Sequence, residues 1–105
     1  MNTDLTVHVG KGADDSVRIE IRGEADVATH TTLQASLAHI PLEGNAPVQL
    51  WLSELTFCDS RALWHMARFA SQVRRRGRQL TTYGATPTIR KMSAILDTER
   101  RLNLV

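Results

Sequence analysis

Hydrophobic and polar residues alternate in two stretches near the start of the chain, residues 5–9 and residues 17–21. A period of two is typical of strands with one buried face. Glycines follow both stretches, so we predict a β-hairpin. A third alternating stretch covers residues 48–52, and a short segment before Gly84 covers residues 79–83. Each of them predicts one further strand.

Three other stretches repeat their apolar residues every three or four positions, which is typical of helices with one buried face. The first predicted helix covers residues 29–40 and ends before Pro41. Its apolar stripe consists of Val27, Leu33, Leu37 and Ile40. The second begins at Ser60 and ends at Gly77, which suits a left-handed cap. Its apolar stripe consists of Leu63, Ala67, Ala70 and Val73.

A third helix is predicted to open at Thr86-Pro87, because a capping residue followed by proline favours a helix start. Its buried side is expected to hold Ile89, Met92 and residues 95–96. The resulting order, ββαβαβα, predicts a single α/β domain over residues 1–105. We expect a mixed sheet of about four to five strands with an N-terminal hairpin and about three to four helices.

The composition is that of an ordinary globular protein, with 42% hydrophobic and 23% charged residues. No apolar run approaches the roughly 20 residues that would span a bilayer, so no membrane insertion is expected. Residues 1–9 lack the features of a signal peptide, which favours a cytoplasmic location. The single cysteine, Cys58, is expected to be a buried thiol. No metal-ligand spacing occurs around it or among His8, His30 and His39, which are expected at the surface.

The formal net charge of +2 raises the question of nucleic-acid binding. Arginines bracket Gly77 at the end of the second predicted helix, and further cations occupy residues 90–91 and 100–101. No aromatic residues are interleaved with them to stack bases. We therefore interpret these cations as solvated helix ends that complement the helix dipole, and we expect no direct nucleic-acid partner.

Asp59-Ser60 stands at the start of the second predicted helix. In open α/β sheets, functional groups collect at the carboxyl ends of strands, where loops lead into helices. Two interpretations of Ser60 stay open. Its hydroxyl could cap the helix by accepting a backbone N–H bond from Ala62 or Leu63. A phosphate on the same hydroxyl would meet free N–H groups and the positive end of the helix dipole, while Asp59 would repel it.

Several short motifs follow one another as they do in STAS domains, and the chain resembles this family over residues 5–105. The motifs are Gly23-Glu24-Ala25-Asp26 with Ala28-Thr29, residues 48–53, Phe57-Cys58-Asp59-Ser60-Arg61-Ala62-Leu63, and Ile89-Arg90-Lys91. The sequence is most similar to the stand-alone anti-sigma factor antagonists. In that family the serine of an Asp-Ser-x-Gly-Leu stretch is phosphorylated, and by position this serine is Ser60.

The resemblance implies a partner-switching regulator of transcription, not an enzyme, with no cofactor. The unphosphorylated protein would bind an anti-sigma factor serine kinase. Phosphorylation of Ser60 adds about −1.5 to −2 charges and would break that contact until a serine phosphatase removes the phosphate. A weak homodimer is a further partner state to consider. The expected partner contacts are Glu24, Asp26, Asp59, Arg61, Ala62 and Trp64.

Two residues depart from the family pattern. Ala62 replaces the glycine of the motif, which crowds a close backbone approach. Trp51 stands where the family's strand commonly has an aspartate, and it could instead cover the second face of the sheet. Arg61 could pair with a phosphate on Ser60 or attract an acidic kinase surface. Trp64 lies on the stripe opposite the core, where it suits a partner interface or packs against a loop.

Other classes of function compete with this one. A STAS subunit that docks on the ATPase of a lipid-transport ABC complex would use the same surface without phosphorylation. A stress-signalling scaffold component is another alternative. An enzyme with Cys58 or Ser60 as its nucleophile is disfavoured. A Cys58–His65 pair would need an oriented imidazole and an anion-stabilising pocket, which the sequence does not indicate, and Ser60 lacks the Gly-x-Ser-x-Gly turn.

Overall fold

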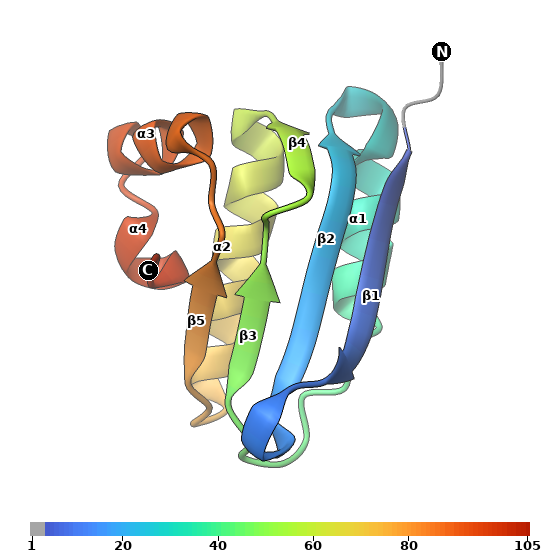
Figure 1. Cartoon of the computed structure of the whole chain (residues 1–105), viewed down its shortest axis with the longest axis vertical. Coiled ribbons are helices and arrows are strands. Elements are labelled where there is room, and N and C mark those ends of the chain that lie inside the picture. Colours follow the sequence, from blue (N-terminus) through green and yellow to red (C-terminus); the bar gives the residue numbers. More distant parts are fainter. Residues whose placement is uncertain (1–3) are drawn as a thin grey trace.

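Five strands and four α-helices make up residues 4–105, the part of the chain that the computed structural model describes (Figure 1). The strands are β1 (Leu5–Lys11), β2 (Val17–Ala25), β3 (Val48–Trp51), β4 (Leu55–Cys58) and β5 (Leu80–Tyr83). The α-helices are α1 (His30–Ala38), α2 (Ser60–Arg75), α3 (Pro87–Ile95) and α4 (Glu99–Leu102). Two short 3-10 helices, η1 (Ala13–Asp15) and η2 (Val27–Thr29), precede β2 and α1. The predicted α/β class and the N-terminal hairpin are confirmed.

The strand β2 is central to the sheet and pairs with three others. β1 pairs with it antiparallel, from Leu5 opposite Gly23 to Lys11 opposite Val17. β3 lies parallel to its first half, whereas β4 lies parallel to its end, where the register shifts between Gly23 and Glu24. β5 pairs with β3, also in parallel. The end of β2 is therefore held beside the end of β4, directly ahead of α2.

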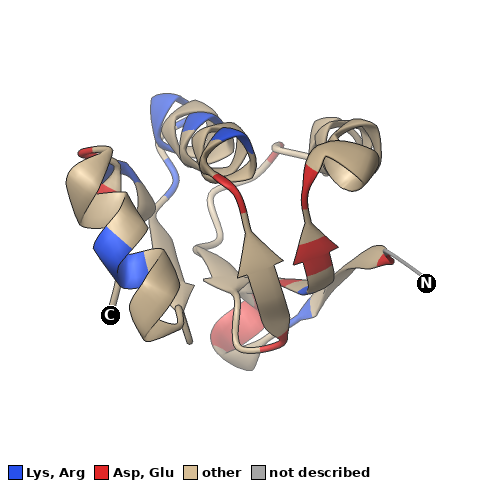
Figure 2. Ribbon diagram, turned by 90° about the horizontal axis from the view of Figure 1, so that it is seen from above, with Lys and Arg blue, Asp and Glu red and all other residues tan. Residues whose placement is uncertain are grey.

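The helices α1 and α2 cover one face of the sheet and leave the other face open, while α3 and α4 lie beside the β5 edge (Figures 1 and 2). Alternate residues of the strands, such as Ile19, Ile21 and Leu50, are fully buried. All residues of the predicted α2 stripe are fully buried as well, which confirms that stripe and fixes which side of α2 faces outward. Within residues 4–105, no helix has both the length and the apolar character needed to cross a membrane.

The sequence prediction missed β4 and α4, each of which has 4 residues. Two residues assigned to buried stripes are exposed instead, Val27 by 82% and Ile95 by 74%. Val27 belongs to η2 and precedes α1, so the periodicity of that helix does not apply to it. Ile95 lies about 240° around α3 from Ile89, since an α-helix turns 100° per residue, and Leu96 returns to the core side in its place.

Arg78 is a buried residue and not the solvated helix end that we expected. The residue is 4% exposed, and its guanidinium donates to the backbone carbonyls of Ala46 and Glu43, at 2.7 and 3.0 Å. These bonds satisfy the buried cation and tie the loop between α1 and β3 to the turn after α2. Gly77, at the same turn, has a φ of +77° and forms the predicted left-handed cap.

Thr82 in β5 is 0% exposed, and its hydroxyl oxygen has no hydrogen-bond partner within residues 4–105. Burying an unpaired hydroxyl costs about 1–3 kcal/mol. Thr82→Val keeps the shape of the side chain and removes that cost. We therefore expect the free energy of unfolding, measured by urea denaturation, to rise by about 1 kcal/mol.

The matched control for this substitution is Thr81→Val, one position earlier in the same strand. The Thr81 hydroxyl is half-buried and accepts a hydrogen bond from the Asn103 amide at 3.3 Å. Removing it should give no gain in stability. Equal effects of the two substitutions would show that the unpaired hydroxyl of Thr82 carries no cost.

Candidate functional site

The residue that caps α2 is Asp59, and not Ser60 as one interpretation of the sequence had it. The Asp59 backbone is extended, and its N–H donates to the Ala25 carbonyl at 3.0 Å. Its carboxylate accepts the Ala62 N–H at 2.8 Å. Aspartate and serine are both favoured at this position, so their order along the chain alone does not decide which of them caps the helix. Pairing of β4 with β2 sets the position of Asp59 and therefore the start of α2.

Ser60 is the first residue of α2 and is exposed. Within residues 4–105 its hydroxyl makes no hydrogen bond. The first N–H groups of a helix have no partner within the helix, and they carry the positive end of its dipole. The hydroxyl is therefore free to react, at a place that accommodates an anion.

His30 is a partner of Asp59 that the sequence did not reveal. Its Nε2 lies 3.0 Å from each carboxylate oxygen of Asp59, and the imidazole side chain is 13% exposed. Our expectation of a surface histidine was therefore wrong for His30. The two residues come from the starts of α1 and α2, which follow the parallel strands β2 and β4. Parallel strands end at the same edge of a sheet, and this brings the two helix starts together.

The turn between β2 and α1 is held by a reciprocal capping box. Asp26 accepts the Ala28 N–H at 3.0 Å, and the Thr29 hydroxyl oxygen accepts the Asp26 N–H at 3.0 Å. The Thr29 hydroxyl also donates to the Glu24 carbonyl at 2.7 Å. Glu24 lies near the end of β2, opposite Phe57. This network fixes the position of the first residue of α1.

The charges of the site are arranged around Asp59. Burial raises the pKa of its carboxyl, but the Ala62 N–H and the His30 imidazole outweigh that effect and lower it, so Asp59 is ionised at neutral pH. Burial, followed by the nearby His30, lowers the pKa of His65, whose ring lies 5.8 Å from that of His30. Burial, and then the Asp59 charge, raises the pKa of Cys58 to about 12, and the thiol is buried as predicted. Within residues 4–105, no three His, Cys, Asp or Glu side chains are placed to hold a metal ion.

A groove of about 640 Å³ opens beside Ser60, between residues 56–60 and α3. Ile89 and Met92 contribute apolar surface to it, and Phe57 in β4 is 51% exposed at the same place. In the sequence, Phe57 was recognised only as part of the family motif and not as a partner contact. An exposed aromatic ring two positions before the capping aspartate is a feature that a partner could contact.

The remaining residues predicted to contact a partner lie along the first turns of α2. Arg61 is exposed directly beside Ser60, and Trp64 is 43% exposed one turn further along. Ala62 is 0% exposed, because its methyl group faces the core. The methyl group therefore adds nothing to the outer surface of α2.

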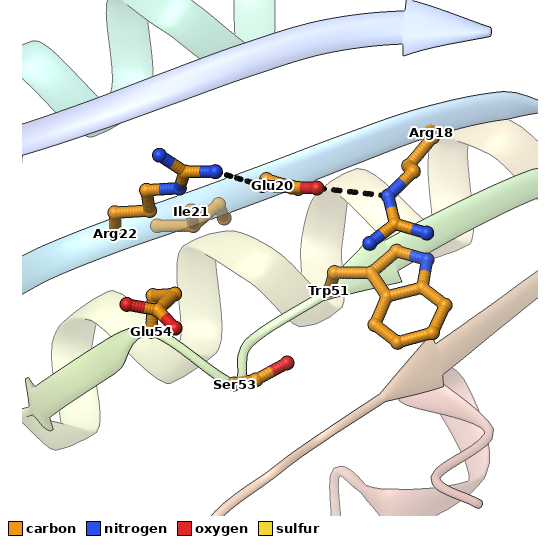
Figure 3. A pocket seen from close by; sticks show the side chains of 7 residues that line it. All are labelled: Arg18, Glu20, Ile21, Arg22, Trp51, Ser53 and Glu54. Carbon is orange, nitrogen blue, oxygen red and sulfur yellow. Dashed lines mark hydrogen bonds and ion pairs between the residues drawn. The ribbon is translucent and has the colours of Figure 1, made fainter. Parts of the chain in front are cut away.

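Trp51 lies on the open face of the sheet (Figure 3). Its ring stacks on Tyr83 with the ring centroids 4.6 Å apart, and the guanidinium carbon of Arg18 lies 4.0 Å from the centre of the indole. Glu20 holds Arg18 and Arg22 in ion pairs at 2.8 and 2.6 Å. Trp51 thus packs over the second face of the sheet, as one of the two interpretations had it, and does not line the groove beside Ser60.

A sheet covered by helices on one face, with an Asp-Ser pair at the start of a central helix, is the arrangement expected of a STAS domain. The chain belongs to the STAS family whose model is described as "Mlab, STAS domain" and matches residues 10–105. No curated protein matches the chain in sequence.

Solved structures share the fold at low sequence identity. An anti-sigma factor antagonist from Mycobacterium paratuberculosis superimposes with a TM-score of 0.83 at 16% identity, over 99% of this chain and 87% of that one. The Bacillus cell fate determinant SpoIIAA in its phosphorylated form gives 0.68 at 15%, over 95% and 91%. The murine Solute Carrier 26 family member A9 anion transporter gives 0.66 at 14%, over 85% of this chain and 16% of the transporter. At these identities the likeness establishes the fold alone.

Proposed function

We propose that this chain is an anti-sigma factor antagonist whose binding to an anti-sigma serine kinase is switched by phosphorylation of Ser60. The observation that carries the proposal is the Ser60 hydroxyl at the first position of α2, which is exposed and has no hydrogen-bond partner among residues 4–105. Because Asp59 does the capping, a phosphate on Ser60 removes no bond that holds the helix. A protein of the same fold has been solved in a phosphorylated form, which supports the choice of switch.

Phosphorylation changes the surface that the kinase would contact. It adds about −1.5 to −2 charges next to the ionised Asp59. The helix N-terminus and Arg61 attract the phosphate, so the fold tolerates it. A kinase seated over the groove, Phe57 and Trp64 would meet the new charge and dissociate. A serine phosphatase would restore binding. The single domain, residues 1–105, would be the substrate of both enzymes in the cytoplasm.

The test is phosphate incorporation into the whole protein. We expect the wild-type chain, incubated with ATP and an anti-sigma serine kinase from the same genome, to gain the mass of one phosphate on the peptide that contains Ser60. Ser60→Ala should reduce the gain to background. Ser53→Ala, at an exposed serine of the turn between β3 and β4, is the matched control and should react as the wild type does. Equal incorporation into Ser60→Ala and the wild type would remove Ser60 as the site.

A second candidate is a STAS subunit that docks on the ATPase of a lipid-transport ABC complex through the same surface, without phosphorylation. Two observations favour keeping it. The family description names Mlab and no sigma factor, and the fold also occurs within an anion transporter. Stable co-purification with a transporter ATPase, unchanged by ATP and accompanied by no phosphate on Ser60, would select this candidate over the first.

A further inference from the structure

The outward side of α2 carries a straight row of long polar and aromatic side chains, which we call the α2 ridge. All of its members are exposed, and at 100° per residue they fall within a sector of about 80°. The row spans 14 helical steps, or about 21 Å. Its members are Arg61, Trp64, Arg68, Gln72 and Arg75.

The charge of the α2 ridge is of one sign. No Asp or Glu occurs anywhere from Ser60 to Leu96. Within residues 4–105, none of the arginines on the α2 ridge forms an ion pair. Figure 2 shows the outer side of α2 with basic segments and no acidic one. These guanidinium groups are therefore available to an external anion.

Neighbouring elements extend the basic surface. Arg76 follows α2 and is exposed, as are Arg100 and Arg101 on α4. The guanidinium carbon of Arg101 lies 5.3 Å from the ring centre of Trp64. This contact keeps a cation and an aromatic ring together at the surface. Together with the three arginines on the α2 ridge, these three make six exposed arginines on this side of the molecule.

The shape of this surface selects among anionic partners. α2 has α1 on one side, and on its other side it contacts α4, which lies at the β5 edge (Figures 1 and 2). Base-specific binding of DNA needs a helix that enters the major groove, which is about 12 Å wide, and neighbours on both sides of α2 hinder that entry. A protein partner needs charges at matched positions, and mixed charges fix its register. The α2 ridge has no acidic residue and therefore does not fix the position of a protein partner along the helix. It suits a broad, uniformly negative surface instead.

We propose that the α2 ridge is a docking surface for an anionic lipid bilayer, on which the protein lies peripherally. Clusters of about 4–8 basic residues bind anionic bilayers, and each cation near the surface strengthens binding by roughly fivefold. Tryptophan prefers the level of the lipid headgroups. Trp64, which is exposed and lies beside Arg101, would sit at that level. This inference does not rest on phosphorylation of Ser60.

The test is sedimentation of the whole protein with vesicles. We expect binding to vesicles of pure phosphatidylglycerol, none to vesicles of pure phosphatidylcholine, and a loss of binding as salt is added. The variant with both Arg68→Glu and Arg75→Glu should raise the Kd for phosphatidylglycerol by about thirtyfold or more. Circular dichroism checks that this variant is folded.

The matched control carries both Lys11→Glu and Arg22→Glu, which change the net charge by the same amount. Both residues are exposed, Lys11 at the end of β1 and Arg22 on the open face of the sheet, away from α2. At a Debye length of about 8 Å their charges are screened from a membrane on the helix side, so the Kd should change less than about fivefold. Equal losses in the two variants would contradict a specific role of the α2 ridge.

Tryptophan fluorescence gives an independent readout. Trp51→Phe leaves Trp64 as the only tryptophan, and its emission should shift to the blue when phosphatidylglycerol vesicles are added. An unchanged emission would contradict contact between the α2 ridge and the bilayer. Binding to polyglutamate or to a DNA duplex, with no binding to vesicles at the same salt, would assign the surface to an acidic protein or a nucleic acid and overturn the proposal. The assay contains neither kinase nor ATP, so its failure is separate from a failure of the proposed switch.

Discussion

Gly23→Ala is expected to lower the free energy of unfolding by about 3 kcal/mol or more. Gly23 has a φ of +102°, a conformation that L-residues with a Cβ avoid. A Cβ built there lies 2.0 Å from the backbone carbonyl oxygen of Asp4, and neither strand can move aside without loss of the β1–β2 pairing. Urea denaturation followed by circular dichroism measures the change.

Gly77→Ala separates the two causes of this loss. Gly77 also has a positive φ, of +77°, but a Cβ at this position would have no neighbour within 4 Å in the described part of the chain. Its substitution should cost only the conformational penalty, about 1 kcal/mol. If the two substitutions destabilise the protein equally, then the close approach of Asp4 contributes nothing, and the steric part of the argument is wrong.

The position of Gly23 also explains why the effect should reach the functional site. The register of β2 against β4 shifts directly after Gly23, and the next residues lie opposite Phe57 and Cys58. The Ala25 carbonyl then accepts the Asp59 N–H. A distorted backbone at Gly23 would displace the strand end that positions the start of α2.

Ser60→Asp is expected to weaken the affinity for the anti-sigma serine kinase by tenfold or more, which corresponds to about 1.4 kcal/mol. The added carboxylate stands beside the ionised Asp59 at the surface that the kinase would contact. The fold should be preserved, because a negative charge in the first turn of a helix is favourable. Isothermal titration calorimetry against the kinase, with the thermal midpoint measured in parallel, separates affinity from stability.

The matched control is Ser60→Asn, which has nearly the same shape as the aspartate and no charge. Its affinity should stay within about threefold of the wild type if charge is the cause. Equal losses for asparagine and aspartate would point to shape, and the repulsion mechanism would be wrong. An unchanged affinity for both would leave Ser60 outside the interface.

Local patterns predicted much of this fold. Alternation located three of the strands, a short segment over residues 79–83 predicted β5, and the apolar stripe of α2 is buried at every predicted position. β4 escaped prediction because its ends, Leu55 and Cys58, are buried while Thr56 and Phe57 between them are exposed, so no alternation occurs. What makes it a strand is pairing with β2, a contact between segments far apart in sequence.

The site was predicted in part, for related reasons. Asp59-Ser60 was recognised at the start of α2, but two adjacent residues with the same capping preference gave no means of choosing between them. The contact between His30 and Asp59 joins positions 29 apart in sequence. It follows from two parallel strands ending at one edge of the sheet, and β4 was the strand that the pattern did not reveal.

The burial of Cys58 has a practical consequence. Because the thiol is buried and its pKa is raised to about 12, it is almost entirely protonated at neutral pH, and we expect it to react only slowly with alkylating reagents in the folded protein. A second cysteine placed at an exposed position such as Gln72 would therefore be the only reactive thiol. Cys58 would then not compete with the introduced cysteine for a fluorescent or spin label, so it need not be replaced before site-specific labelling.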